Sequence, residues 1–188
     1  MVISLGGNFV NERSSGTFAR LKMVPGSMRS IFGAKVIVFL MVAIFQVVLI
    51  FSTAKLIFPL IGLPDLQLPS NLLGLFMMTV LSGLSAVAFA MFIGTITSSQ
   101  VQANGLGAVL VVIFAAIGGI WVPLFVMPET MQQLAQISPL YWCLQGFYEL
   151  FLHGGEWSSL GKIFTVLIVF ILACFSVTFI KLRQERLF

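Results

Sequence analysis

The side chains that could support acid–base, metal or nucleophilic chemistry are few, and no charged residue lies inside the long apolar stretches of this chain. The single histidine is His153 and the two cysteines are Cys143 and Cys174, so a His/Cys metal site would lack ligands. Both cysteines are expected to pack as small apolar residues. The sequence contains no Gly-x-Ser-x-Gly elbow and no His-Glu-x-x-His pair. We therefore expect neither catalytic residues nor a bound metal.

The segment from Gly26 to Val36 resembles a nucleotide-binding loop only superficially. Gly26 and Gly33 have the wrong spacing, Ala34 separates Gly33 from Lys35, and Val36 stands where serine or threonine must hold magnesium. No nucleotide cofactor is therefore expected on this chain. A proton-driven carrier would need ionisable groups at membrane depth, so any uphill transport must draw its energy from a partner.

Four uncharged apolar stretches are the elements that must position any functional residue. They are Val36–Ala54, Leu72–Thr97, Gly105–Met127 and Ile163–Ile180, each close to the ~20 residues that cross ~30 Å of hydrocarbon as a helix. With 59% hydrophobic and 9% charged residues, a soluble fold would expose too much apolar surface. We predict an all-α, polytopic membrane helix bundle that forms a single domain over residues 1–188.

The basic residues are distributed unevenly about these spans. Those on one side are Arg13, Arg20, Lys22, Arg29, Lys35, Lys181, Arg183 and Arg186, and those on the other are Lys55 and Lys162. Basic residues mark the cytoplasmic side of a membrane, which predicts that both ends of the chain are cytoplasmic. The same distribution explains the net charge of +4 without a nucleic-acid partner.

The connecting segments carry their own signals. Met1–Val10 is apolar but about half a span long, which predicts the cytoplasmic end of a span whose beginning is missing and hence a truncated chain. Arg13–Val24 is expected to form a short cytoplasmic helix that Pro25-Gly26 ends. Lys55–Ser70 is expected to be an irregular outer loop, and Ser98–Asn104 a short inner turn.

The second span carries small residues at four-residue intervals, which allow another helix to approach closely. They are Ser82, Ala86, Ala90, Gly94 and Ser98. Such a stripe packs either against a second copy or within one bundle, and we favour packing within the bundle.

The region after the third span predicts two short helices joined at Ser138-Pro139. Pro128 can start the first, with a polar face made by Glu129, Gln132, Gln133 and Gln136. Ser138 is expected to cap the second helix and Pro139 to occupy its first position. The apolar face of the second helix is predicted to be Leu140, Leu144, Phe147 and Phe151. At ~15 and ~20 Å both helices are too short to cross a membrane, so they should lie at the outer interface or dip into it as a re-entrant pair.

Two stretches together resemble the permease subunit of type-2 ATP-binding-cassette exporters. The first is Asn11-Glu12-Arg13-Ser-Ser-Gly16-Thr17-Phe-Ala-Arg20-Leu21, followed by Pro25 and Lys35. The second is Gly118-Gly119-Ile-Trp121-Val-Pro123-Leu-Phe125-Val-Met127-Pro128, then Ile137-Ser138-Pro139-Leu140-Tyr141-Trp142 and Gly146. Trp142 departs from the family's general signature, which prefers a smaller polar or basic residue there. The resemblance covers essentially the whole chain.

The resemblance implies that residues 11–25 are a coupling helix resting in a groove of a separate ATPase subunit, and that a second permease copy completes a homo- or heterodimer. Its coupling residues would be Glu12, Arg13, Gly16, Thr17, Arg20, Leu21 and Pro25. Residues 128–152 would be the outer hairpin that caps the pathway, with Trp121, Pro123, Pro128, Ser138, Pro139 and Trp142 as its marker residues.

Several alternatives stay open at this stage. Residues 11–25 could instead anchor the chain to anionic lipid. The family's permeases usually begin with a further span and an external domain, so the chain could be a non-transporting fragment. A self-contained channel or membrane enzyme should show a charged pore ring or buried acid–base residues, which this sequence lacks.

Overall fold

The computed structural model describes residues 2–14 and 28–184, which fold entirely into helices and their connections. The helices are α1 (Val2–Ser14), α3 (Met28–Leu60), α4 (Leu72–Ile96), α5 (Gln100–Ile117), the 3-10 helix η1 (Leu124–Val126), α6 (Glu129–Ala135), α7 (Pro139–Leu152) and α8 (Trp157–Gln184). Four of them, α3, α4, α5 and α8, are long and apolar enough to cross a membrane. The prediction of an all-α polytopic bundle is confirmed.

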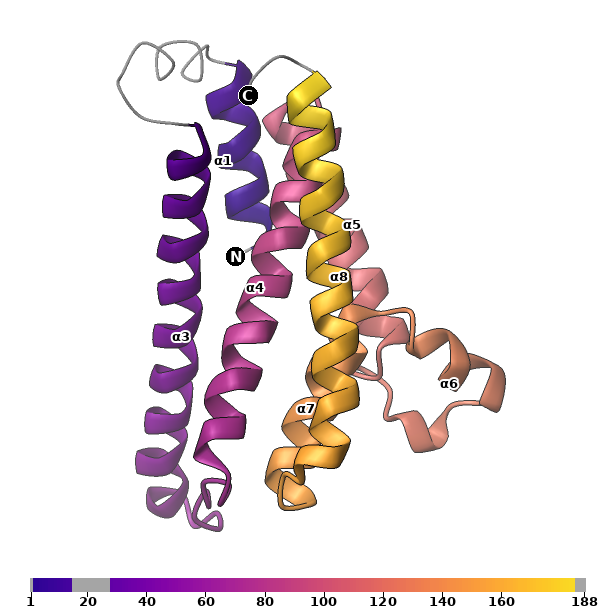
Figure 1. The fold of residues 1–188 in the computed structure, drawn as a ribbon. Coiled ribbons are helices and arrows are strands. Elements are labelled where there is room, and N and C mark those ends of the chain that lie inside the picture. Colours follow the sequence, from indigo (N-terminus) through magenta and orange to yellow (C-terminus); the bar gives the residue numbers. More distant parts are fainter. Residues whose placement is uncertain (1, 15–27, 185–188) are drawn as a thin grey trace.

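The helices α3, α4 and α8 run along the length of the molecule, with α4 in the middle (Figure 1). α4 packs against α1, α3, α5, α7 and α8. The end of α1, the start of α3 and the end of α8 lie together, and we call this the basic end because Lys35, Lys181 and Arg183 belong to it. The connections α3–α4 and α7–α8 lie at the opposite end, which we call the hairpin end, and α6 projects sideways (Figure 1).

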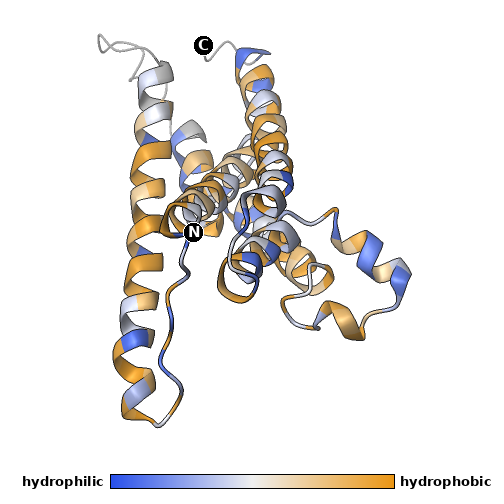
Figure 2. Cartoon of the chain, turned by 60° about the horizontal axis from the view of Figure 1, so that its bottom comes forward, coloured by the Kyte–Doolittle hydropathy of each residue, from blue (hydrophilic) through white to orange (hydrophobic). Residues whose placement is uncertain are grey.

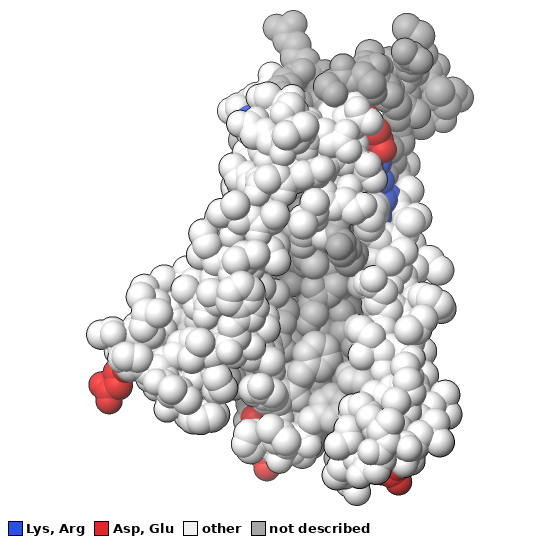
Figure 3. Space-filling view, turned by 180° about the vertical axis from the view of Figure 1, so that it is seen from behind, with Lys and Arg blue, Asp and Glu red and all other residues white. Residues whose placement is uncertain are grey.

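The surface has the polarity expected of a membrane protein. Apolar residues cover most of α3, and hydrophilic residues gather on α6 and near the helix ends (Figure 2). Large side chains such as Ile37, Phe45 and Ile50 are more than half exposed along α3, which lipid can cover. Figure 3 shows charged residues only near the two ends of the rear face, whose uncharged middle is hollowed.

Three expected boundaries are wrong. The first outer loop is shorter than predicted, because α3 continues through Lys55 to Leu60. The third span ends at Ile117 rather than Met127, since Gly119 has a left-handed φ of 86° and Pro123 follows it. α5 also starts early, at Gln100.

Ser99 sets that early start. Its hydroxyl accepts a hydrogen bond from the Gln102 N–H at 3.2 Å, which caps the first turn of α5. Only residues 97–99 therefore join α4 to α5, and the predicted turn Ser98–Asn104 is mostly helical.

Candidate functional site

The predicted coupling segment is described only at its beginning. Residues 11–14 continue α1 as its last turn, and Glu12 lies there. Gly16, Thr17, Arg20, Leu21 and Pro25 lie outside the described residues, as does the side chain of Arg13. The half-span predicted for Met1–Val10 is a real helix, α1, which buries Leu5, Phe9 and Val10 against the bundle.

Glu12 and Lys35 form an ion pair that joins α1 to α3 at the basic end. Their side chains are 36% and 18% exposed, respectively. The Lys35 ammonium also lies 5.5 Å from the centroid of the Phe9 ring, within the range of a cation–π interaction. The charge of Lys35 is therefore held between a carboxylate and an aromatic face.

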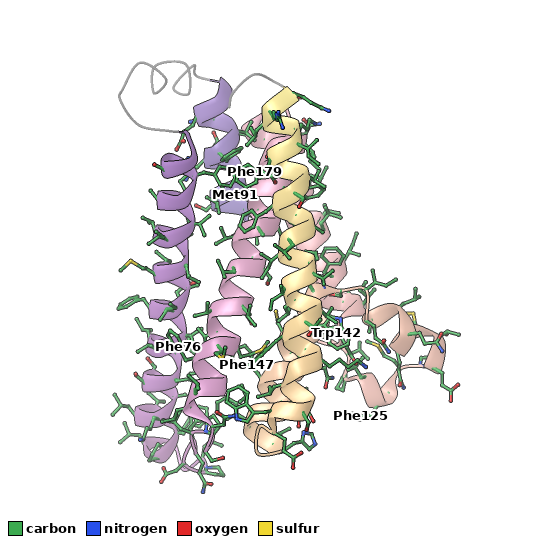
Figure 4. The ribbon with its side chains drawn as sticks, viewed as in Figure 1. Phe76, Met91, Phe125, Trp142, Phe147 and Phe179 are labelled. Atoms are coloured by element: carbon green, nitrogen blue, oxygen red, sulfur yellow. The ribbon has the colours of Figure 1, made fainter. Side chains whose placement is uncertain are left out.

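A phenylalanine cluster lies at this end of the bundle. The rings of Phe9 in α1 and Phe32 in α3 are perpendicular at 6.0 Å, and Phe32 lies 5.1 Å from Phe179 in α8. Met91 of α4 belongs to the same buried core, and Figure 4 places Met91 and Phe179 toward the basic end. The aromatic packing therefore ties α1, α3 and α8 together near the ion pair.

The small-residue stripe of α4 packs within the chain at its basic half. A Cβ on Gly94 would lie 2.9 Å from the Gly6 carbonyl oxygen, and a Cβ on Gly6 would lie 3.2 Å from the Ala90 carbonyl oxygen. α1 and α4 therefore cross with their backbones almost touching. At the other half, Ser82 and Ala86 line a small cavity of about 160 Å³ between α4, α5, α7 and α8.

The predicted outer hairpin consists of two separate helices, α6 and α7, as expected from Ser138-Pro139. Pro139 occupies the first turn of α7, where its missing N–H costs no intrahelical hydrogen bond. Glu129, Gln133 and Gln136 are exposed and Gln132 is half-buried, so the polar face of α6 is as predicted. Met131 and Leu134 are also exposed on this projecting helix.

The predicted capping role of Ser138 is wrong. Its side chain makes no capping hydrogen bond to α7. Instead the fully buried Ser138 hydroxyl donates a hydrogen bond of 2.8 Å to the carbonyl oxygen of Phe114, in the last turn of α5. A carbonyl oxygen can accept two hydrogen bonds. The Phe114 oxygen accepts one from the Gly118 N–H and the other from Ser138. Ser138 thus fastens the hairpin corner to α5.

Trp142 holds the same corner from the other side. Its indole Nε1 donates a hydrogen bond of 2.7 Å to the carbonyl oxygen of Gln136, the residue that ends α6. The ring is 8% exposed, with the Lys162 ammonium 5.7 Å from it. Figure 4 shows Trp142 beside the α6 arm. A smaller polar residue at this position could not span the corner in the same way.

The buried face of α7 differs from the predicted one. Leu140, Leu144, Phe147 and Phe151 are only half-buried, whereas the buried residues are Pro139, Trp142, Gly146 and Leu150. The reason is Gly146, where an added Cβ would lie 2.4 Å from the Met78 sulfur, so α4 approaches α7 along this line. Periodicity alone favours large apolar side chains and misses a contact made by a glycine.

The remaining marker residues lie on the connection between α5 and α6. Trp121, Pro123 and Pro128 are all exposed there. Nothing in the described part of the chain brings them against Ser138, Pro139 and Trp142, so the six hairpin residues form a buried group of three and an exposed group of three.

Sequence reasoning missed Asn71. Its Oδ1 accepts a hydrogen bond of 2.8 Å from the Gly74 N–H and caps α4, while its Nδ2 donates one of 2.9 Å to the Gly155 carbonyl oxygen. Asn71 thereby ties the start of α4 to the connection between α7 and α8. An asparagine directly before an apolar run is a helix-start signal that could have found it.

The arrangement offers binding surfaces rather than reactive groups. Among residues 2–14 and 28–184 no cluster of three or more His, Cys, Asp or Glu could hold a metal. A wholly apolar hollow of about 400 Å³ opens between α3 and α7 at the hairpin end. It is lined by Val47, Ile50, Phe51, Leu66, Phe147, Tyr148, Phe151 and Leu152. Such a site suits an apolar group.

Comparison with known proteins identifies the family of the chain. No solved structure matches the chain. It is 27% identical over 186 residues to a protein of Bacillus subtilis (strain 168) named "Putative transport permease YvfS", and the match covers 98% of this chain and 72% of that relative. A family model described as ABC-2 family transporter protein matches residues 1–180. The chain therefore belongs to the ABC-2 family of transporters and is a multi-pass transport permease.

Proposed function

We propose that this chain forms the membrane pathway of an ATP-driven exporter and works with a separate ATP-binding-cassette ATPase subunit and a second permease copy. The observation that carries this proposal is the family match over residues 1–180. A chain that lacks a nucleotide-binding loop cannot supply the energy itself, so hydrolysis is assigned to the partner.

Residues 11–25 are the part of the chain we assign to the ATPase subunit. They comprise the last turn of α1 and most of its connection to α3, so a force applied there reaches two helices of the bundle directly. Their basic residues, Arg13, Arg20 and Lys22, suit a protein groove with acidic rims. We place this segment and both chain ends in the bacterial cytoplasm because of the excess of basic residues at this end.

The cargo we infer is amphipathic or lipid-like. The hollow between α3 and α7 is lined by apolar atoms, and no charged residue lies in the middle of any described span. A highly charged cargo would find no partner at that depth. The hairpin α6–α7 is proposed to cap the outer end of the path.

The test is purification of the tagged chain from detergent-solubilised membranes of its own cells. We expect it to bring down a protein with a nucleotide-binding loop, and the complex in liposomes to hydrolyse ATP. Arg20→Glu should reduce co-purification and hydrolysis by roughly tenfold or more, since like charges placed together at an interface cost several kcal/mol.

Lys55→Glu is the matched control, because it makes the same change of charge at the opposite end of the bundle. It should leave both readouts unchanged. If Arg20→Glu matches the unaltered chain in capture and hydrolysis, residues 11–25 serve only as a membrane anchor.

A further inference from the structure

We infer that Glu12 and Lys35 are positioning residues whose ion pair makes the end of α1 and the start of α3 move as one body. The inference rests on the proposed function, because the connection between these helices, residues 15–27, contains most of the segment 11–25 that we assign to the ATPase subunit. The family resemblance predicts that Glu12 contacts the ATPase subunit, whereas in the structure Glu12 contacts Lys35 of its own chain.

The first step is the strength of the pair. Glu12 lies in the last turn of α1 and Lys35 about two turns into α3. Exposed ion pairs contribute little, but the Lys35 side chain is only 18% exposed and its ammonium also faces the Phe9 ring. Removing the carboxylate would take the Glu12 charge away from a largely buried ammonium, which is more costly than losing a pair on the surface.

The second step is what else connects the two helices. The extensive packing of α1 is with α4 and α5, and that of α3 is with α4. The contacts between α1 and α3 include the ion pair of Glu12 with Lys35 and the ring contact of Phe9 with Phe32. The rings can slide at little cost, since aromatic packing tolerates several geometries. Of these two contacts, the ion pair is the one that fixes the position of α1 relative to α3 more strictly.

The third step is its position. The pair lies on the two helices that flank residues 15–27, three residues before this segment and eight after it. A displacement of the segment reaches the bundle through these two helices. When they are linked, both respond together, and when they are not, one can yield while the other stays in place. The linked helices then transmit the displacement to α4, on which both pack, and to α8, which Phe32 contacts through Phe179.

A distance measurement tests the joint without any ATPase subunit. Nitroxide labels at Asn8→Cys on α1 and Ile37→Cys on α3, both exposed, are introduced with Cys143→Ala and Cys174→Ala. In liposomes, electron paramagnetic resonance should give a narrow distance distribution. Glu12→Gln and Lys35→Met should each broaden it. The charge exchange Glu12→Lys with Lys35→Glu should narrow it again, and Lys55→Met, at the other end of α3, should leave it unchanged.

A hydrolysis measurement then tests the role in coupling. Glu12→Gln should still capture the ATPase subunit, yet stimulation of ATP hydrolysis by the permease should fall by at least about fivefold, the lower limit of typical coupling between linked sites. The charge exchange should restore most of it. A structural defect alone would not be rescued by reversing both charges.

The two measurements test separately whether the ion pair joins α1 to α3 and whether this joint takes part in coupling. Unbroadened distances in both single variants overturn the joint, whatever the protein's function. Broadened distances with unchanged hydrolysis overturn its role in coupling. If the unaltered chain captures no ATPase subunit, the proposed function fails and the coupling role falls with it, while the distances still decide whether the pair joins α1 to α3.

Discussion

At the scale of single residues, the hairpin corner depends on two side chains that satisfy carbonyl oxygens at helix ends. Ser138 donates to Phe114 of α5 and Trp142 to Gln136 of α6. Both acceptors lie at the ends of helices; the Phe114 oxygen also accepts a hydrogen bond from the Gly118 N–H. The corner is thus held by the ends of the two helices that precede it in sequence, and its shape depends on buried polar contacts.

Ser138→Ala should lower the free energy of unfolding by about 0.5–1.5 kcal/mol, the net value of one hydrogen bond. The lower part of that range is expected, because the Phe114 oxygen keeps its bond from the Gly118 N–H. Thermal unfolding in detergent micelles measures the change. Ser158→Ala removes an exposed hydroxyl on α8 and is the control. Equal melting temperatures for the two variants would contradict the role assigned to Ser138.

At this scale the sequence predicts where a helix breaks better than it predicts which residues make contact. Ser138 and Pro139 correctly predicted the break between α6 and α7, since proline cannot continue a helix. The acceptor of the Ser138 hydroxyl could not be predicted, because Phe114 lies 24 residues away and meets it only through the packing of α5 on α7. Local patterns do not contain such distant partners.

At the scale of elements, the crossing of α1 and α4 has little room for side chains. Gly94→Ala should destabilise the fold by about 1–3 kcal/mol, the usual cost of overpacking. The new Cβ would lie 2.9 Å from the Gly6 carbonyl oxygen and 3.1 Å from the Cβ of Phe9, so α1 would have to shift as a whole. Thermal unfolding in detergent should show the loss.

Gly105→Ala gives the matched comparison within α5. A Cβ there would meet nothing within 4 Å, and alanine is better than glycine inside a helix by roughly 0.5–1 kcal/mol. The two substitutions should therefore move the melting temperature in opposite directions. A stabilising Gly94→Ala would mean that α1 is not seated on α4 as the structure has it.

The elements themselves were largely predictable. The apolar runs gave all four spans, because uncharged stretches of this length have no stable place in water. The end of α5 was missed since apolar residues continue past Gly119, whose backbone conformation decides the boundary. The buried face of α7 was missed because Gly146 carries no side chain that periodicity could register.

At the scale of the whole molecule, the distribution of basic residues determines the orientation of the bundle in the membrane. Lys35, Lys181 and Arg183 belong to the basic end, whereas Lys55 and Lys162 lie toward the hairpin end. The spans between them carry no charge, so either orientation would satisfy the hydrocarbon core. Only the basic residues choose between the two orientations, by favouring the cytoplasmic side.

Single cysteines at Ser99, Ser70 and Ser159 should reveal that orientation. All three positions are exposed; Ser99 lies in the turn between α4 and α5, and Ser70 and Ser159 lie at the hairpin end. In a background with Cys143→Ala and Cys174→Ala, a membrane-impermeant maleimide added to intact cells should label Ser70→Cys and Ser159→Cys. Ser99→Cys should react only after the membrane is permeabilised. The opposite pattern would invert the molecule and place residues 11–25 outside, where no ATPase subunit could reach them.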